Sequence, residues 1–187
     1  MATVNPLQYL QQAELIHSEQ AVNLAISTVA EHLNRDYLNK KEAPIVLCVM
    51  GGAVFFTGQL LPQLLFPLEL DYVQASRYQG ETEGKVLKWL VRPKENIKNR
   101  NVLILDDILD EGITLIAILE QCKLLGAKDI KSAVLVEKQH NYKKPIEADY
   151  VGLMVADHYV FGCGMDVYGW WRNLPAIYAL KKCLNPL

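Results

Sequence analysis

The amino-acid sequence predicts an α/β fold in which a central, mainly parallel sheet is flanked by helices. Two observations support this prediction. Short apolar runs alternate along the chain with longer segments of helical periodicity, and strands that alternate with helices form right-handed βαβ units. The 187 residues suffice for one domain with a real core. Because such sheets bind ligands beyond the carboxyl ends of their strands, we expect functional residues just after Met50, Leu105 and Val136.

The individual elements follow from local patterns. Apolar residues at helical spacing predict helices over residues 13–38, 54–65 and 114–125. Gly126 closes the third helix as its C-terminal cap. Short apolar or alternating runs predict strands over residues 45–50, 68–76, 85–91, 102–105 and 130–136, with further short strands after Tyr150. Between two of these strands, residues 79–84 are polar and carry two glycines, so a mobile loop is expected.

Composition excludes several classes of function. The net charge of −2 gives no general attraction to nucleic acid or to an anionic membrane. No apolar run approaches the roughly 18 residues of a membrane span, and the N-terminus does not resemble a secretion signal. The four cysteines are far apart and form no Cys-x-x-Cys pair. Buried, reduced thiols in a cytoplasmic protein are therefore expected.

The segment 103–114, Leu-Ile-Leu-Asp-Asp-Ile-Leu-Asp-Glu-Gly-Ile-Thr, carries the strongest functional signal. A helix N-terminus offers unpaired N–H groups and a positive dipole to a phosphate. Gly112 lets the backbone approach that anion closely, and Thr114 can donate its hydroxyl. Asp106 and Asp107, at the end of a strand, can accept hydrogen bonds from a vicinal diol. If the acidic pair stood alone, the better interpretation would be that Asp106 and Asp107 are solvated residues at a strand end and that Thr114 only caps the following helix.

The complete twelve-residue segment resembles the phosphoribosyl-diphosphate motif of type I phosphoribosyltransferases. The resemblance implies that this substrate binds along Asp106, Asp107, Asp110, Glu111, Gly112, Ile113 and Thr114. It implies that Asp106 and Asp107 hold the ribose and Mg²⁺, and that Asp110 is the catalytic acid or base for the purine N7 proton. Glu111 replaces the threonine of most members, so its side chain is expected to face away from the phosphate.

The resemblance also implies the type I phosphoribosyltransferase fold as a single domain over residues 1–187. Its core is expected over about 40–155, with a small hood formed by about 1–15 and 156–187. Residues 46–56 resemble the family's diphosphate-binding turn, which implies roles for Gly51 and Gly52 and a cis peptide bond between Met50 and Gly51.

Three segments of the C-terminal third, 149–153, 157–166 and 171–175, are similar to hypoxanthine-guanine phosphoribosyltransferases. The similarity implies that Tyr159 stacks on the purine, that the Val160 backbone binds its edge, and that Lys138 donates to its 6-oxo oxygen. Asp166 is expected to belong to the purine-binding site and also to bind Mg²⁺, which makes the expected metal ligands Asp106, Asp107 and Asp166. Arg172 is expected to contact diphosphate.

The same resemblance points to two further segments. Arg77 and Tyr78 match the start of the family's closing loop, although Arg77 replaces a serine. Related enzymes often place an arginine near residues 139–144 for diphosphate, and this chain offers Lys143 and Lys144, between which the sequence does not choose.

The resemblance implies transfer of a phosphoribosyl group to hypoxanthine, guanine or both, giving IMP or GMP and diphosphate, by a homodimer or homotetramer. A xanthine-preferring enzyme is the nearest alternative. A regulatory protein that senses phosphoribosyl diphosphate and binds nucleic acid is another, but it calls for a basic face or an added segment. A dinucleotide-binding domain is disfavoured because no Gly-x-Gly-x-x-Gly follows a strand.

Overall fold

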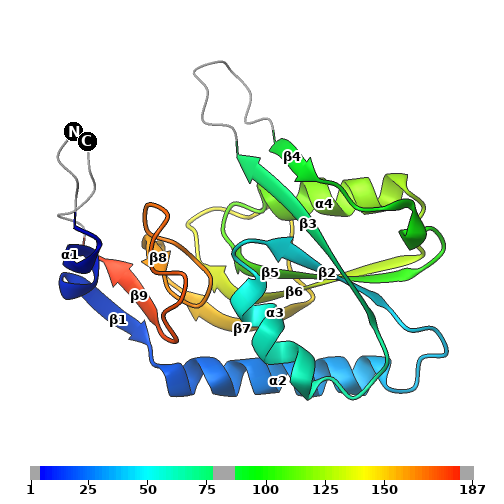
Figure 1. Cartoon of the computed structure of the whole chain (residues 1–187), viewed down its shortest axis with the longest axis horizontal. Helices are drawn as coiled ribbons and strands as arrows, with labels where there is room; N and C mark the ends of the chain where they lie inside the picture. Colours follow the sequence, from blue (N-terminus) through cyan, green and yellow to red (C-terminus); the bar gives the residue numbers. More distant parts are fainter. Residues whose placement is uncertain (1–4, 78–86, 182–187) are drawn as a thin grey trace.

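The computed structural model describes residues 5–77 and 87–181, and its main feature is a six-stranded sheet of order β4-β3-β2-β5-β6-β7 (Figure 1). The strands are β2 (Ile45–Met50), β3 (Glu69–Arg77), β4 (Leu87–Val91), β5 (Asn101–Leu109), β6 (Asp129–Lys138) and β7 (Tyr150–Val155). All neighbours run parallel except β3 and β4, which are antiparallel. The predicted mainly parallel α/β fold is therefore confirmed.

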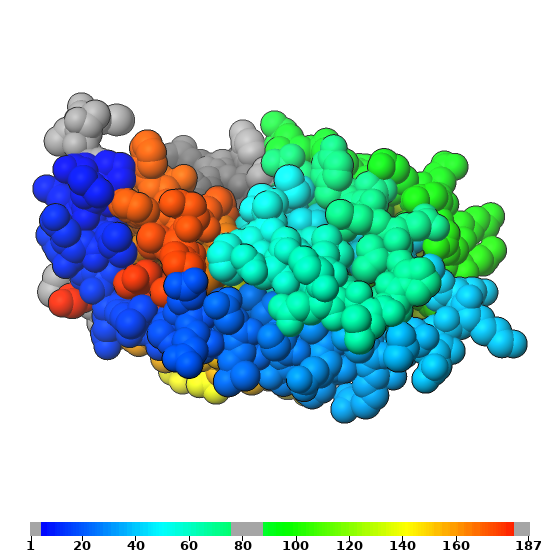
Figure 2. All heavy atoms as spheres, turned by 60° about the horizontal axis from the view of Figure 1, so that its bottom comes forward, coloured from blue at the N-terminus to red at the C-terminus, as the bar shows by residue number. Residues whose placement is uncertain are grey.

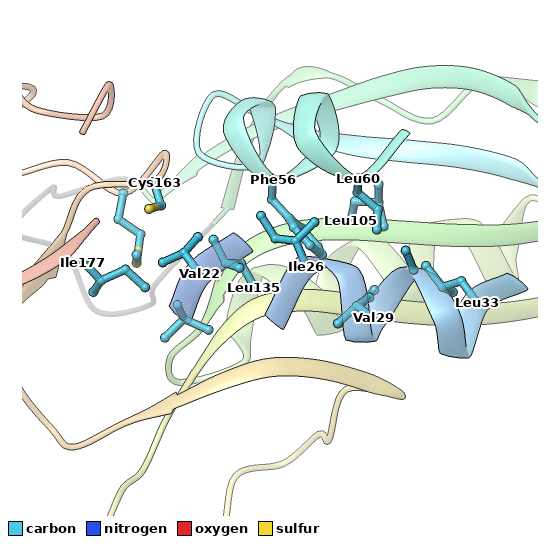
Figure 3. Close-up of a cluster of buried hydrophobic side chains, with 14 of the residues drawn as sticks. Val22, Ile26, Val29, Leu33, Phe56, Leu60, Leu105, Leu135, Cys163 and Ile177 are labelled. Carbon is cyan, nitrogen blue, oxygen red and sulfur yellow. The ribbon is translucent and has the colours of Figure 1, made fainter. Parts of the chain in front are cut away.

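Helices cover both faces of this sheet: α2 (Glu19–Tyr37) and α3 (Val54–Leu60) on one face, α4 (Ile113–Leu124) on the other. Alternate residues of each strand point to opposite faces. Val46 of β2 packs with α2 and α3, whereas its neighbours Ile45 and Leu47 pack with α4. Figure 3 shows the first of these clusters, where apolar side chains of α2 and α3 meet those of β5 and β6.

A second, three-stranded sheet lies at one end of the molecule. It consists of β1 (Ala13–His17), β9 (Ile177–Leu180) and β8 (Val160–Phe161), in the order β1-β9-β8, with both pairs antiparallel. The short helix α1 (Pro6–Gln11) precedes it. Figure 2 shows the N-terminal segment, in blue, lying beside the orange C-terminal segment at this end. This small sheet brings β8, with the predicted base-binding residue Val160, to the main sheet.

Two local predictions were wrong, the start of the helix predicted over residues 13–38 and the end of the strand predicted over residues 102–105. Residues 13–17 form a strand rather than the first turns of a helix, because they pair with β9, which is far away in sequence. Helix α2 begins only after Ser18, whose hydroxyl oxygen accepts a hydrogen bond from the Ala21 N–H at 3.3 Å. The fifth strand does not end at Leu105 but continues to Leu109, since its outer half pairs with β6.

The strand order places the predicted functional residues together. The chain runs from β2 to β3 on one side and later returns to place β5 on the other side of β2. A ligand cleft is expected at such a reversal, outside the carboxyl ends of the two strands. Met50, Leu109 and Lys138 are the last residues of β2, β5 and β6. The loops after these parallel strands therefore meet at one edge of the sheet.

Two predictions from composition can be compared with the structure. Cys48, Cys122 and Cys163 are buried and unpaired, as expected, and burial raises the pKa of the Cys122 thiol to about 11. Cys183 lies outside the described residues. Over residues 5–77 and 87–181, every helix is too short or too polar to cross a membrane.

Candidate active site

A cavity of about 270 Å³ lies where the turn after β2 meets the loop between β5 and α4. Gly112 is the N-terminal cap of α4 and has a φ of 85°, which favours glycine. Because a glycine has no side chain to cap the helix, the first N–H groups of α4 can bind an anion. Eight residues predicted to bind phosphoribosyl diphosphate line this cavity: Gly51, Gly52, Asp106, Asp107, Asp110, Gly112, Thr114 and Arg172.

Glycines allow the walls of this cavity to approach one another. A Cβ atom at Gly52 would overlap the Asp107 carboxylate, and a Cβ at Gly164 would overlap the carbonyl oxygen of Gly52. The turn after β2, strand β5 and the segment after β8 therefore converge at these positions. The peptide bond between Met50 and Gly51 is cis, as the resemblance implied.

The acidic pair lies within β5 and is held by the backbone. Asp106 is buried, and its Oδ1 accepts a hydrogen bond from the Asp107 N–H at 2.9 Å. The Asp107 Oδ1 accepts one from the Ile108 N–H at 3.0 Å. Burial raises the pKa of the Asp107 carboxyl, and the Asp106 hydrogen bond and the Arg172 charge offset this only in part. Two adjacent carboxylates in this largely buried part of β5 favour a cation or a sugar hydroxyl beside them.

Asp110 has a different electrostatic environment. Its Oδ2 accepts a hydrogen bond from Lys138 Nζ at 2.9 Å, and its Oδ1 lies 2.8 Å from His140 Nε2. Burial alone would raise the pKa of Asp110, but the hydrogen bonds and charges of Lys138 and His140 outweigh burial and hold it below its usual value. Asp110 is therefore an ionised carboxylate at neutral pH, able to accept a proton.

A second cavity, of about 210 Å³, adjoins the first and shares Asp107, Ile108 and Asp110 with it. Its remaining lining residues are Lys138, Tyr159, Val160, Met165 and Asp166. All four residues predicted to bind the base thus line one cavity, although they come from β6 and from the segment around β8. The Tyr159 ring stacks on Tyr168, with centroids 5.8 Å apart and planes at 18°.

Asp166 and Arg172 contact each other beside this second cavity. Arg172 Nη2 lies 2.5 Å from Asp166 Oδ1, and Arg172 Nη1 donates to the Gly164 carbonyl oxygen at 2.6 Å. The Gly169 N–H donates to the other Asp166 oxygen at 2.7 Å. The predicted metal ligand and the predicted diphosphate ligand therefore form an ion pair in this structure.

Several predicted residues lie outside these two cavities. Glu111 and Ile113 belong to the same loop as Gly112 but do not line either cavity. Arg77 ends β3, and Tyr78 and the rest of the predicted closing loop fall outside the described residues. In the described segments, no three acidic, histidine or cysteine side chains gather as a ready-made metal site.

The structure separates the two lysines between which the sequence did not choose. Lys144 Nζ donates to Glu137 at 3.0 Å and to the Leu109 carbonyl oxygen at 3.1 Å, and its side chain is buried. It therefore connects the end of β5, where the loop to α4 begins, to β6. Lys143 is exposed.

Sequence reasoning missed His140, Ile108 and Met165. His140 lies two residues after Lys138, the last residue of β6. A histidine just beyond the carboxyl end of a parallel strand could have been proposed as a site residue from the sequence. Ile108 and Met165 are apolar side chains next to predicted site residues and line the second cavity. An apolar residue in such a position has no sequence signature that distinguishes it from the core.

Comparison with known proteins agrees with this geometry. Residues 12–170 match the phosphoribosyl transferase domain family, and the chain belongs to that family. A hypoxanthine-guanine-xanthine phosphoribosyltransferase of Tritrichomonas foetus is 33% identical over 169 residues, which cover 90% of this chain and 91% of the relative. A hypoxanthine-guanine phosphoribosyltransferase of Bacillus subtilis is 32% identical over 175 residues, 91% of this chain and 94% of the relative.

A solved structure is also similar. The hypoxanthine phosphoribosyltransferase of Trypanosoma cruzi in complex with the product IMP has a TM-score of 0.84 and 27% identity, and the match covers 93% of this chain and 97% of that one.

Proposed function

We propose that this protein is a purine-salvage phosphoribosyltransferase that converts hypoxanthine, guanine or both, with phosphoribosyl diphosphate, to IMP or GMP and diphosphate. The observation that carries the proposal is the pair of adjoining cavities. One is lined by residues at the N-terminus of α4 and by the acidic pair, and the other is lined by Lys138, Tyr159 and Val160. Asp107, Ile108 and Asp110 belong to both, where a sugar must join a base.

The first cavity suits the sugar phosphate. The N–H groups at the start of α4 and the Thr114 hydroxyl bind the 5′-phosphate, while Asp106 and Asp107 accept hydrogen bonds from the ribose hydroxyls. Glu111 and Ile113 contribute backbone N–H groups, and the Glu111 side chain faces away from the phosphate. The turn at Gly51 and Gly52 and the guanidinium of Arg172 bind diphosphate.

The second cavity suits a 6-oxopurine. Tyr159 stacks on the ring, the Val160 backbone binds its edge, and Lys138 donates to the 6-oxo oxygen. Such stacking contributes on the order of 1 kcal/mol beyond area burial. Adenine places an amino group where the oxygen should be, so Lys138 would face a donor instead of an acceptor. Asp110, ionised beside the base, takes the N7 proton as the new C–N bond forms.

The residues present fit Mg²⁺ as the metal. Asp106 and Asp107 are close carboxylates in a buried setting, and Asp166 lies at the adjoining cavity. Since the described residues hold no cluster of three ligands, the remaining ligands are substrate oxygens and water, a coordination that Mg²⁺ commonly adopts. When bound, Mg²⁺ neutralises charge on the departing diphosphate.

The proposal extends to the organisation of the protein. The main sheet forms a core over about 40–155, and the small sheet belongs to a hood over about 1–15 and 156–187. The segment that begins at Arg77 and Tyr78 closes over the site and excludes water. Buried, unpaired cysteines support a cytoplasmic location.

A homodimer or homotetramer is proposed from the outer surface of α3 and β3. An apolar groove of about 450 Å³ lies there, and Val54, Leu70 and Tyr72 on its walls are exposed. Large apolar side chains gathered on one face often form an interface between subunits. Sedimentation of the purified protein tests this; a monomer at micromolar concentration contradicts it.

Diphosphate release tests the proposed reaction. With hypoxanthine, phosphoribosyl diphosphate and Mg²⁺, we expect one diphosphate and one IMP per turnover, and no turnover when Mg²⁺ is chelated. Preference for xanthine in the same assay would favour the xanthine-specific alternative. Salt-dependent binding of nucleic acid without turnover would favour the regulatory alternative.

A further inference from the structure

The imidazole of His140 is a nearly buried titratable group to which the proposed reaction gives no role. Its side chain is 6% exposed, and Nε2 lies 2.8 Å from Asp110 Oδ1. His140 does not line the cavity proposed for the base. It lines a separate cavity of about 540 Å³ that also contains Lys138 and Tyr142. The imidazole therefore approaches Asp110 from the side that does not face the substrate.

Three groups hold this imidazole in place. Asp110 contacts Nε2, and the Oδ2 atom of Asp157 lies 3.5 Å from Nδ1. The Tyr142 ring stacks on the imidazole, with centroids 4.7 Å apart and planes at 13°. A side chain that is 6% exposed, contacts a carboxylate through Nε2 and stacks on an aromatic ring has little freedom, so it can restrain Asp110 in turn.

The two oxygens of Asp110 have different partners. Lys138 binds Oδ2 at 2.9 Å, and His140 contacts Oδ1. In the proposed reaction Lys138 donates to the 6-oxo oxygen of the base, and this weakens the hydrogen bond between Lys138 Nζ and Asp110 Oδ2. His140 does not line the base cavity, so its contact with Oδ1 is independent of the base. Asp110 then keeps one fixed partner while Oδ2 becomes free to accept a proton.

We propose that His140 is a positioning residue, which holds Asp110 by Oδ1 so that Oδ2 stays directed at the base when Lys138 turns to the substrate. The proposal rests on the proposed function, because it assigns a partner to the acid–base residue of that reaction. His140 itself touches neither base nor diphosphate. Its effect belongs to the chemical step and not to substrate affinity.

A change in pH dependence should accompany the loss of this contact. Lys138 and His140 contact Asp110 directly, and Asp157 lies 3.9 Å from Lys138 Nζ. Asp106, Asp107 and Arg172 line the same cavity as Asp110, and Asp166 lines the adjoining one. Lys138 and His140 lower the pKa of Asp110. Asp110 must be ionised to accept a proton, so removing His140 raises its pKa. The acid-side loss of activity then moves to higher pH.

The test compares His140→Leu with His140→Gln in the intact protein. Leucine fills the space without a hydrogen bond, whereas the glutamine amide can reach Asp110 from a similar position. We expect His140→Leu to lower kcat on the order of 10- to 100-fold, with the KM for phosphoribosyl diphosphate nearly unchanged. Its acid limb should lie at higher pH than that of the wild type. His140→Gln should recover most of kcat.

Gln139→Ala is the matched control, since Gln139 is the exposed neighbour between Lys138 and His140. It should keep wild-type kcat. If thermal melting shows that His140→Leu is not folded, His140→Asn replaces it, because the shorter asparagine side chain does not reach Asp110. Wild-type kcat and pH profile in these variants would overturn the proposal, as would equal losses in the leucine and glutamine variants. A wild-type protein that makes no nucleotide refutes the proposed function itself, and the inference with it.

Discussion

Replacing Asp110 with asparagine removes the proposed proton acceptor while keeping its size. In the native site each oxygen of Asp110 has its own partner, Lys138 Nζ at 2.9 Å and His140 Nε2 at 2.8 Å. Asparagine has one oxygen, so its NH₂ group must face one of these two side chains. Loss of a general acid or base costs about 10²- to 10⁴-fold in rate, which corresponds to roughly 2.7–5.4 kcal/mol of barrier.

Asp110→Asn does not alter the parts of the loop that are proposed to bind phosphate. The Gly112 turn, the start of α4 and Thr114 remain, so phosphoribosyl diphosphate should bind with nearly native affinity. The assay is IMP formation under saturating substrates, with calorimetric binding of phosphoribosyl diphosphate and Mg²⁺ measured in parallel. Glu120→Gln, an equal loss of charge at an exposed site on α4, is the control. Turnover of Asp110→Asn within twofold of the wild type would refute the role of Asp110.

Three further outcomes are expected. Lys138→Ala should reduce the preference for hypoxanthine over adenine, and an unchanged ratio in base competition would refute the specificity argument. Gly52→Ala should destabilise the fold by about 1–3 kcal/mol, because the new Cβ meets the Asp107 carboxylate. Gly58→Ala, in open space on α3, should instead stabilise the fold by about 0.5–1 kcal/mol. Equal melting temperatures of the two variants would contradict this prediction. Burial raises the pKa of Asp107 above its unfolded value of about 4. Protonated Asp107 therefore favours the folded state. This contribution to the free energy of unfolding is fully present below about pH 4 and is lost as pH rises through the folded pKa. Asp107→Asn should therefore melt higher than the ligand-free wild type at pH 7.5, with the difference vanishing near pH 4, while activity is abolished.

Much of the fold follows from local patterns, because buried parallel strands are continuous apolar runs. Strand β2 spans Ile45–Met50, as predicted. The loop between β5 and α4 could be proposed as a phosphate site because the family motif that it resembles is a contiguous order of acids, glycine and threonine. Errors arose where tertiary pairing decides the structure. Residues 13–17 have apolar side chains compatible with a helix, and only β9 makes them a strand.

The second cavity, which is proposed to bind the base, could likewise not be predicted from local sequence patterns. Lys138, Tyr159 and Val160 could be proposed from family resemblance, but their meeting in one cavity depends on how β6 and β8 are placed. The contacts of Asp110 with Lys138 and His140 join residues 28 and 30 positions apart. No local pattern reports such a contact, so the position of His140 behind Asp110 became visible only in three dimensions.

The central claim is transfer of a phosphoribosyl group to a 6-oxopurine, and rates with four bases test it most directly. Hypoxanthine, guanine, xanthine and adenine are each supplied with phosphoribosyl diphosphate and Mg²⁺, and nucleotide formation is followed by absorbance. We predict rapid formation of IMP, GMP or both, with kcat/KM for adenine lower by at least about 100-fold, since Lys138 then lacks its acceptor. Adenine used as well as hypoxanthine, or no nucleotide from any base, would contradict the account.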